Sequence, residues 1–322
     1  MRTYKELFEL ISKHIAETSY GAEPRELYEP INYMMSLGGK RLRPVTTLMA
    51  CNMFDEEIEK AIPAALAIEM FHNFTLVHDD IMDNAPLRRG KETIYKKWNM
   101  PIAILSGDLM MIKATESLCK TETSDIIKLL KKFNDIATKV CEGQQIDMNF
   151  ESRNDVSHNE YINMISLKTA VLLGGALQIG ALIGGANEED AGHLYEFGKN
   201  TGIAFQVQDD ILDSFGDAGK TGKKTGGDIA ADKKTLLLIE LLAAAHKDDK
   251  KLLQELMNEI DDDKKITGIL QLYHKYKVKE FAEAEKEKYL QLAYRHFNKV
   301  NVNADRKSIL KQTAEELMSR TS

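Results

Sequence analysis

Two short segments of the chain carry the same acidic spacing about 130 positions apart. Residues 78–83 read HDDIMD and residues 208–213 read QDDILD, so both contain the pattern Asp-Asp-x-x-Asp. In a helix the first and last carboxylates of this pattern share a face, because they lie four residues apart. Carboxylates held this close repel each other, and their burial without a counter-charge is strongly unfavourable. The pattern therefore makes chemical sense where cations bind.

Both acidic segments lie among apolar residues. Phe74, Val77 and Ile81 surround the first motif, and Phe205 and Ile211 surround the second. Carboxylates on an apolar helix are expected to point into a cleft, whereas the alternative is a solvated acidic patch. Ligands that are all oxygen suit Mg²⁺, which keeps several waters and is completed by phosphate oxygens. Two such helices facing each other would hold a diphosphate through bridging ions.

Basic residues occur in short groups close to the acidic motifs. They are Lys40, Arg41 and Arg43 in GGKRLRP, Arg88, Arg89 and Lys91 after the first motif, and Lys220, Lys223, Lys224, Lys233 and Lys234 in the glycine-rich segment after the second. Lys and Arg in such segments are ordinary phosphate ligands, and they are also ordinary surface residues. The glycine-rich segment lacks the spacing of a nucleotide-binding P-loop and follows no strand, so that reading is disfavoured.

The elements that must position these residues are predicted to be helices. Apolar residues recur at three- and four-residue spacings in 4–15, 61–81, 126–140, 161–185 and 236–242, and no run shows the alternation of a strand. Prolines are expected at helix boundaries, at Pro30, Pro44, Pro86 and Pro101. Ser157 with Glu160 forms a capping box, and Asn187 precedes three acidic residues. The fold class expected from these signals is all-α, with many helices in one domain.

Composition sets further bounds. The 322 residues are 43% apolar and 29% charged, which predicts one globular domain over residues 1–322. The net charge is −7 and no long basic tract occurs, so no nucleic-acid partner is expected. The highly charged segment 246–265 is expected to form a solvated helical hairpin.

Several features bear on compartment. Cys51, Cys119 and Cys141 lack the spacing of a zinc or redox site and are expected to be reduced thiols. The N-terminal segment lacks the apolar core of a signal peptide, so the expected location is cytoplasmic. The uncharged stretch Ala170–Ala186 is slightly short for a membrane span, and we expect a buried helix and no transmembrane segment.

The motifs taken together resemble the trans-isoprenyl diphosphate synthases, also called polyprenyl synthetases. The matching segments are GGKRLRP, HDDIMDNAPLRRG, GQQID, the Lys168–Thr169 pair, FQVQDDILD and GKKTGGDIAADKKT, which span Gly38 to Thr235. The resemblance implies the isoprenoid synthase fold, an all-α bundle of many helices around a deep central cavity, usually as a homodimer. It also implies a prenyltransferase that joins an allylic diphosphate to isopentenyl diphosphate with Mg²⁺, at three ions per active site.

The resemblance also implies roles for individual residues. Asp79, Asp80, Asp83, Asp209 and Asp210 would bind the metal ions that hold the allylic diphosphate, with Asp213 supporting them. Arg88, Lys168 and Lys223 would contact that diphosphate, and Lys40, Arg43, His72 and Arg89 would bind isopentenyl diphosphate. Lys168, Thr169 and Gln206 would lie near the developing cation, and Lys233 in a closing loop.

Product length is expected to depend on the residues just before the first motif. By resemblance, the bulky Phe74 is the floor of the product tunnel, and the small Thr75 follows it, which is typical of synthases of the twenty-carbon geranylgeranyl diphosphate. An ideal helical wheel sets Phe74 off the carboxylate face, with Thr75, Phe71 and His72 nearer to it. Plain core packing is therefore an open alternative for Phe74 and Phe71.

Other functions remain to be weighed. The product could instead be farnesyl diphosphate or a longer polyprenyl diphosphate. A class I terpene cyclase usually carries an Asn/Ser/Glu triad where this chain has DDILD. A catalytically silent partner subunit often lacks one of the six aspartates, all of which are present here. A non-enzymatic acidic metal-binding bundle would leave the basic groups without a role.

Overall fold

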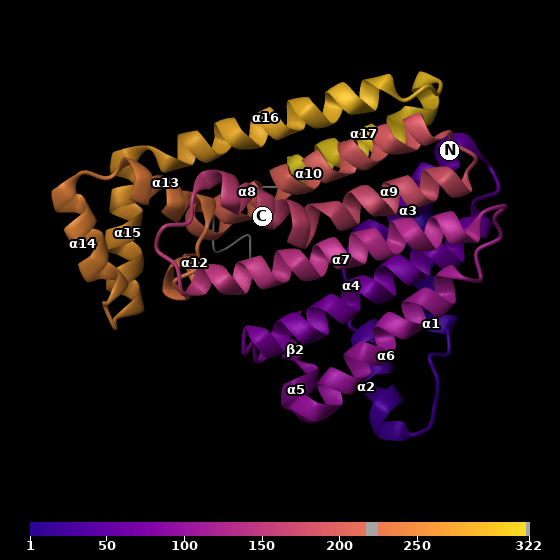
Figure 1. Cartoon of the computed structure of the whole chain (residues 1–322), viewed down its shortest axis with the longest axis horizontal. Helices are drawn as coiled ribbons and strands as arrows, with labels where there is room; N and C mark the ends of the chain where they lie inside the picture. The colour runs from indigo at the N-terminus through magenta and orange to yellow at the C-terminus, as the bar shows by residue number, and fades with distance from the viewer. Residues whose placement is uncertain (217–224, 320–322) are drawn as a thin grey trace. The chain divides into compact units, whose positions relative to one another are not determined.

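The computed structural model describes residues 1–216 and 225–319 (Figure 1). The chain divides into two compact units. Unit 1 comprises residues 1–137, 175–195 and 300–311, and unit 2 comprises residues 138–174, 196–299 and those from 312 onward. Both units are built almost wholly of helices, which confirms the all-α fold class. The expectation of a single domain stays a prediction.

Unit 1 begins with six helices and one 3₁₀ turn. They are α1 (Tyr4–Glu17), α2 (Arg25–Ser36), α3 (Leu42–Phe54), η1 (Ile58–Ala61), α4 (Ile62–Met82), α5 (Ile94–Lys97) and α6 (Met100–Leu118). The helix that carries the first motif, α4, packs against α3 and α6. A Cβ atom at Gly107 of α6 would overlap the ring of His78, so glycine permits this close packing. The C-terminal end of α4 is thereby fixed against α6.

A two-stranded hairpin follows the first motif. The strands β1 (Leu87–Arg88) and β2 (Lys91–Glu92) pair antiparallel, with Arg88 opposite Lys91. The two turn residues, Arg89 and Gly90, both have positive φ, of 53° and 73°, as the tightest hairpin turns require. The expectation of no strand was wrong here. Strands of two residues each are too short to show an alternating pattern, and the turn residue Arg89 is not a usual one.

Prolines mark helix boundaries less strictly than expected. Pro44 and Pro101 lie in the first turns of α3 and α6, where the missing N–H has no helical partner to lose. Pro30, in contrast, lies inside α2, so the expected boundary was wrong there. It is buried with Ile31 and Met34, and burial of this face outweighs one missing helical hydrogen bond.

Four long helices contribute residues to both units. They are α7 (Ile126–Glu151), α9 (Val171–Ile183), α10 (Glu188–Phe215) and α17 (Ala304–Met318). Asn187 caps α10 as expected, since its Oδ1 accepts from the backbone N–H of Asp190 at 2.8 Å. Within unit 1, a Cβ atom at Gly180 of α9 would overlap the backbone of Thr47 of α3, so glycine permits the close approach of these two helices.

The remaining elements belong to unit 2. They are α8 (His158–Ile165), the π-helical turn η2 (Ser166–Ala170), α12 (Gly227–Ala230), α13 (Leu236–Ala244), α14 (Lys247–Met257), α15 (Asp262–Tyr276) and α16 (Val278–Lys299). The capping box of Ser157 and Glu160 is present at the start of α8. Apolar side chains of α8, α10, α13 and α15 form one core, which includes Tyr161, Ile211 and Tyr273.

The charged segment after α13 forms the expected helical hairpin. Figure 1 shows α14 and α15 side by side, and the two helices are in contact. One residue departs from the solvated pattern, since Lys265 is only 4% exposed. Its ammonium group pairs with Asp232, just beyond α12, at 2.8 Å. The hairpin therefore contacts the segment that follows the second motif.

Among the described residues, the helical stretch His158–Ile183 is long and apolar enough to cross a membrane, by length and composition alone. Within its most apolar window 67% of the residues are buried. A core helix of a globular protein has the same properties. All three cysteines are free thiols, as expected.

Candidate active site

The first motif lies at the C-terminal end of α4, where its carboxylates are held differently. Asp80 is buried and its Oδ1 accepts from Nε of Arg88 at 2.7 Å. Burial raises the pKa of Asp80, and the Arg88 guanidinium acts in the opposite direction. Asp79 is partly exposed and lies 3.8 Å from Arg88, whereas Asp83 is exposed. The hairpin residue Arg88 thus binds the buried carboxylate and leaves two more accessible ones beside it.

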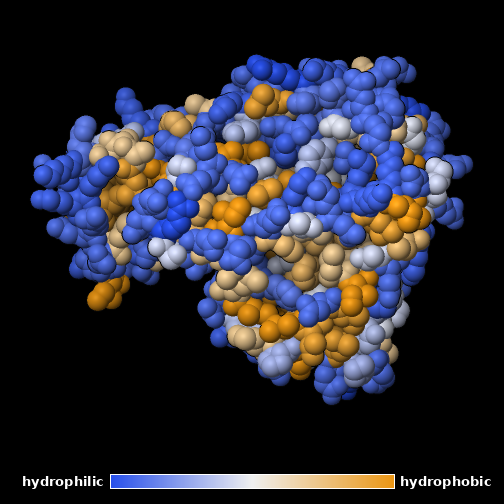
Figure 2. Space-filling view, in the orientation of Figure 1, coloured by the Kyte–Doolittle hydropathy of each residue, from blue (hydrophilic) through white to orange (hydrophobic). Residues whose placement is uncertain are grey.

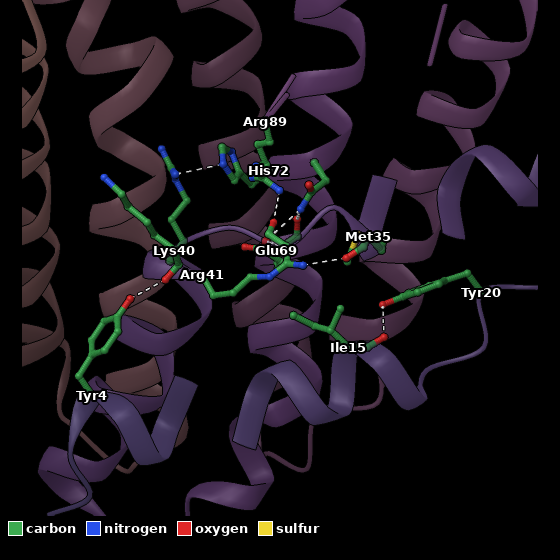
Figure 3. Close-up of polar contacts among 12 residues, drawn as sticks. Tyr4, Ile15, Tyr20, Met35, Lys40, Arg41, Glu69, His72 and Arg89 are labelled. Carbon is green, nitrogen blue, oxygen red and sulfur yellow. Dashed lines mark hydrogen bonds and ion pairs between the residues drawn. The ribbon is translucent and has the colours of Figure 1, made fainter. Parts of the chain in front are cut away.

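Four residues predicted to bind isopentenyl diphosphate come together in unit 1. Nη1 of Arg43 lies 3.2 Å from Nε2 of His72, and the Arg89 guanidinium donates to the carbonyl oxygen of Gly38. Lys40 lies two residues after Gly38, in the turn before α3. Figure 3 shows Lys40 on the same side of this turn as Arg89 and His72. The Nε–H of Arg43 is buried and has no hydrogen-bond partner. Lys40, Arg43, His72 and Arg89 are called the basic cluster below.

The electrostatics of the basic cluster favour an anion. Burial lowers the pKa of His72 well below its ordinary value, and the positive charges of Arg43, Arg89, Arg88 and Arg41 lower it further. The imidazole is therefore neutral near pH 7. Arg88 and Arg41 are paired with Asp80 and Glu69, so Arg43 and Arg89 are the two guanidinium groups whose charges an anionic ligand would offset.

The second motif lies near the end of α10 in unit 2. Asp209 is exposed, whereas Asp210 is 3% exposed. One oxygen of Asp210 accepts from the hydroxyl of Tyr161 at 2.5 Å and from the first backbone N–H of α13, that of Leu236, at 3.1 Å. Burial raises the pKa of Asp210 to about 7, although these hydrogen bonds lower it. Sequence reasoning missed Tyr161, because nothing in an apolar helix pattern singles out one buried aromatic hydroxyl.

The third carboxylate of the second motif supports the backbone. Oδ2 of Asp213 accepts from the backbone N–H of Asp228, in the first turn of α12, at 2.9 Å. The carbonyl oxygen of Asp213 accepts from the N–H of Gly226 at 2.7 Å. The expected role of Asp213 in supporting the metal-binding aspartates stays a prediction. Lys233 is exposed and lies 3.8 Å from Asp228, and Lys223 lies outside the described residues.

The predicted catalytic pair lies in an irregular helix. Lys168 and Thr169 belong to the π turn η2, a feature often found at functional sites. Nζ of Lys168 pairs with Asp147 at 2.6 Å, and a Cβ atom at Gly143 would overlap the backbone nitrogen of Lys168. The segment GQQID thus has a physical role. Its glycine permits contact with η2, and its aspartate holds the lysine.

A chain of weaker contacts links this pair to the second motif. The hydroxyl of Thr169 lies 3.4 Å from Oε1 of Gln206, and Nε2 of Gln206 lies 3.4 Å from Oδ1 of Asp210. The structure therefore brings together Lys168, Thr169, Gln206 and Asp210, all predicted from the sequence. It adds Asp147, which sequence reasoning quoted within GQQID without giving it a role.

The candidate chain-length residues lie one turn before the first motif. The ring of Phe74 packs between Phe71 and His78, with centroid distances of 5.6 and 4.8 Å. Phe71 is fully buried and contacts Phe133 of α7. The hydroxyl of Thr75 is bonded to a backbone carbonyl of its own helix. These contacts agree with core packing for Phe71, and the floor role of Phe74 stays a prediction.

Within each unit, the acidic motif offers oxygen ligands of the kind that suit a magnesium ion. Among residues 1–216 and 225–319, no group of three His, Cys, Asp or Glu side chains forms a metal cage by itself. Mg²⁺ does not need such a cage, because one or two carboxylates with water and phosphate oxygens complete its octahedron. The exposed carboxylates Asp83 and Asp209 and the partly exposed Asp79 are of this kind.

Known proteins share this sequence and fold along nearly the whole chain. Residues 24–275 match the polyprenyl synthetase family. The geranylgeranyl diphosphate synthase of Sulfolobus acidocaldarius is 38% identical over 307 residues, which cover 94% of this chain and 92% of the relative. The short chain isoprenyl diphosphate synthase of Methanocaldococcus jannaschii is 37% identical over 308 residues, covering 94% and 91%.

Solved structures of related enzymes have the same fold as this chain. A crystal structure of geranylgeranyl pyrophosphate synthase is 41% identical and superposes with a TM-score of 0.92 over 100% of both chains. The geranylgeranyl pyrophosphate synthetase of Pyrococcus horikoshii is 34% identical, with a TM-score of 0.92 over 98% of this chain and 99% of the other. The family resemblance seen in the motifs is thereby confirmed. The chain belongs to the polyprenyl synthetase family.

Proposed function

We propose that the protein is a prenyltransferase that condenses an allylic diphosphate with isopentenyl diphosphate, with geranylgeranyl diphosphate as its product. Several relatives at 38 to 43% identity are named geranylgeranyl diphosphate or pyrophosphate synthases. The observation that carries the proposal is the double role of Arg88. It pairs with Asp80 of the first motif, and its charge also acts on His72 of the basic cluster.

The two substrates carry pyrophosphate groups that need different partners. The carboxylates of the two motifs would hold Mg²⁺, which neutralises the pyrophosphate that leaves the allylic substrate. The basic cluster offers guanidinium and ammonium donors for the pyrophosphate of isopentenyl diphosphate, which does not leave. A chain with both kinds of site can bind one substrate that ionises and one that reacts as an alkene.

The remaining site residues would act on the charge that develops. As the allylic carbon–oxygen bond breaks, Lys168, which pairs with Asp147, would stabilise the departing anion. The oxygens of Thr169 and Gln206, which lie 3.4 Å apart, would stabilise the allylic cation. The alkene of isopentenyl diphosphate attacks the cation, a carbon–carbon bond forms, and a proton is lost to the released pyrophosphate. Water must be excluded from the cation throughout.

Labelled isopentenyl diphosphate tests this function. The purified protein is incubated with Mg²⁺ and, in turn, dimethylallyl, geranyl and farnesyl diphosphates, and the products are sized by chromatography. Incorporation of label into a twenty-carbon product is expected. A hydrocarbon formed without uptake of label would indicate a terpene cyclase, and no turnover with any primer would indicate a silent partner subunit.

A homodimer is part of the proposal. Apolar side chains on one side of α6 are exposed by 43 to 60%, namely Met100, Ile104, Leu105 and Ile112. Figure 2 shows apolar residues gathered on the visible surface in this part of unit 1. Apolar patches of this kind commonly mark subunit contacts, and we assign the patch to a second copy of the chain. Leu105→Glu should give a monomer by light scattering, whereas Ile260→Glu, at an exposed position between α14 and α15, should not.

A further inference from the structure

The turn that carries the basic cluster has an unusual backbone. Gly38 and Gly39 have φ of 72° and 131°, and Arg41 has φ of 46°. Glycine adopts such angles freely, whereas arginine does so against a steric penalty. Arg41 is also the N-cap of α3, and its side chain makes no capping hydrogen bond there. Its conformation must therefore be held by contacts elsewhere.

Buried contacts hold Arg41. The side chain is 7% exposed, its Nη1 pairs with the carboxylate of Glu69, and its Nη2 donates to the carbonyl oxygen of Met35 at 2.7 Å. Glu69 lies on α4 and is 2% exposed. Nδ2 of Asn73, one turn further along α4, donates to the carbonyl oxygen and to Oε1 of Glu69 at 2.8 and 3.0 Å. Figure 3 shows Arg41 spanning from the turn to Glu69 and Met35.

The residues on either side of Arg41 are fixed as well. The carbonyl oxygen of Lys40 accepts from the hydroxyl of Tyr4 at 2.5 Å. The Arg89 guanidinium donates to the carbonyl oxygen of Gly38 and lies so close to Gly39 that a Cβ atom there would be 2.9 Å from it. Contacts from α1, α4 and the hairpin thus fix one short turn, which carries Lys40 and leads into α3, where Arg43 lies in the first helical turn.

Glu69 also provides a buried negative charge among the basic residues. Burial disfavours the charged forms of Arg43 and Arg89, which lowers the pKa of each, and Glu69 acts in the opposite direction on both. Its direct partner is Arg41. The carboxylate therefore neutralises one guanidinium inside the protein and leaves the basic cluster for an anionic ligand.

We propose that Arg41 and Glu69 are positioning residues for the pyrophosphate of isopentenyl diphosphate. Neither would touch the substrate. The buried pair holds the left-handed turn that presents Lys40 and Arg43, so that these donors need little reorganisation when the substrate binds. This inference rests on the proposed binding of isopentenyl diphosphate at the basic cluster.

The test replaces the pair by apolar residues of similar length. Arg41→Met/Glu69→Met removes both charges together, which avoids leaving one buried charge unpaired, and such replacements often preserve folding. We expect the KM for isopentenyl diphosphate to rise on the order of ten-fold or more. The KM for the allylic diphosphate and kcat at saturation should change by less than about three-fold. Glu69→Gln keeps the shape of the side chain and removes its charge. It should likewise raise the KM for isopentenyl diphosphate more than the KM for the allylic diphosphate.

Controls separate this effect from a loss of stability. Asp55→Met/Lys60→Met removes another ion pair of unit 1, and should leave both KM values unchanged at a comparable melting temperature. A folded Arg41→Met/Glu69→Met variant with unchanged KM values, or with both KM values raised equally, would overturn the inference alone. Failure of the wild-type protein to consume isopentenyl diphosphate would overturn the proposed function and this inference together.

Discussion

Asp210→Asn should stabilise the metal-free protein above pH 7 while it abolishes elongation. Asp210 is 3% exposed, and burial raises its pKa from 3.8 to about 7. The folded protein therefore binds a proton at this carboxyl more tightly than the unfolded chain does. This tighter proton binding adds to the free energy of unfolding. The contribution is fully present below pH 3.8 and is lost as the pH rises through about 7. The side-chain amide of the Asp210→Asn variant does not ionise, so its free energy of unfolding does not change with pH at this site.

The magnitude follows from the same pKa values. Between pH 3.8 and about 7 the folded protein holds up to one proton more at this site than the unfolded chain, and each pH unit in the middle of that range then costs about 1.36 kcal/mol. The free energy of unfolding of the wild type should therefore fall relative to Asp210→Asn by about 2.3 kcal/mol between pH 5 and pH 7, and by about 2.6 kcal/mol by pH 8. The amide oxygen that replaces Oδ2 can still accept from the hydroxyl of Tyr161 and the N–H of Leu236, and only the weaker 3.4 Å contact with Nε2 of Gln206 is lost.

Urea unfolding followed by circular dichroism measures this difference. Wild type and Asp210→Asn are compared in EDTA at pH 5, 6, 7 and 8, so that other titrating groups cancel. Asp209→Asn is the matched control, because the adjacent Asp209 is exposed and its substitution should give no gap that grows with pH. A difference between wild type and Asp210→Asn that stays constant from pH 5 to pH 8, or that shrinks, would refute the reasoning.

Three further outcomes are expected. Phe74→Ala should lengthen the product if Phe74 closes the tunnel, and an unchanged product distribution by chromatography would remove that role. Removal of divalent ions by EDTA and the substitution Asp80→Ala should each abolish incorporation of labelled isopentenyl diphosphate, and activity that survives both would exclude the metal mechanism. Asp213→Ala removes the acceptor for the N–H of Asp228, so urea unfolding should show a loss of about 1 to 2 kcal/mol; no loss would mean that this hydrogen bond contributes nothing.

The helices could be predicted because their signals are local. Apolar spacing in 61–81 corresponds to α4, and the capping signals at Ser157 and Asn187 lie at the starts of α8 and α10. Pro30 shows the limit, because packing of a whole helix face outweighs one local preference. The hairpin after α4 was missed since its strands are two residues each.

The candidate site was predictable where residue type alone indicates chemistry. Aspartates, arginines and lysines in motifs could be assigned to metal and phosphate, and the structure brings Arg43, His72 and Arg89 together as expected. The buried partners could not be foreseen. Glu69 and Tyr161 act through contacts with residues distant in sequence, and a single sequence carries no signal for such pairs.

The π turn at Ser166–Ala170 sets the rotation of the residues before it relative to those after it. A π turn is what one inserted residue leaves behind in an α-helix, and each residue of an α-helix rotates the next by about 100°. Loss of a single codon in this turn would restore a regular helix, yet it would swing Tyr161 and all of α8 away from Asp210 relative to the residues that follow. The hydrogen bond between Tyr161 and Asp210 is thus compatible only with the longer form of this helix.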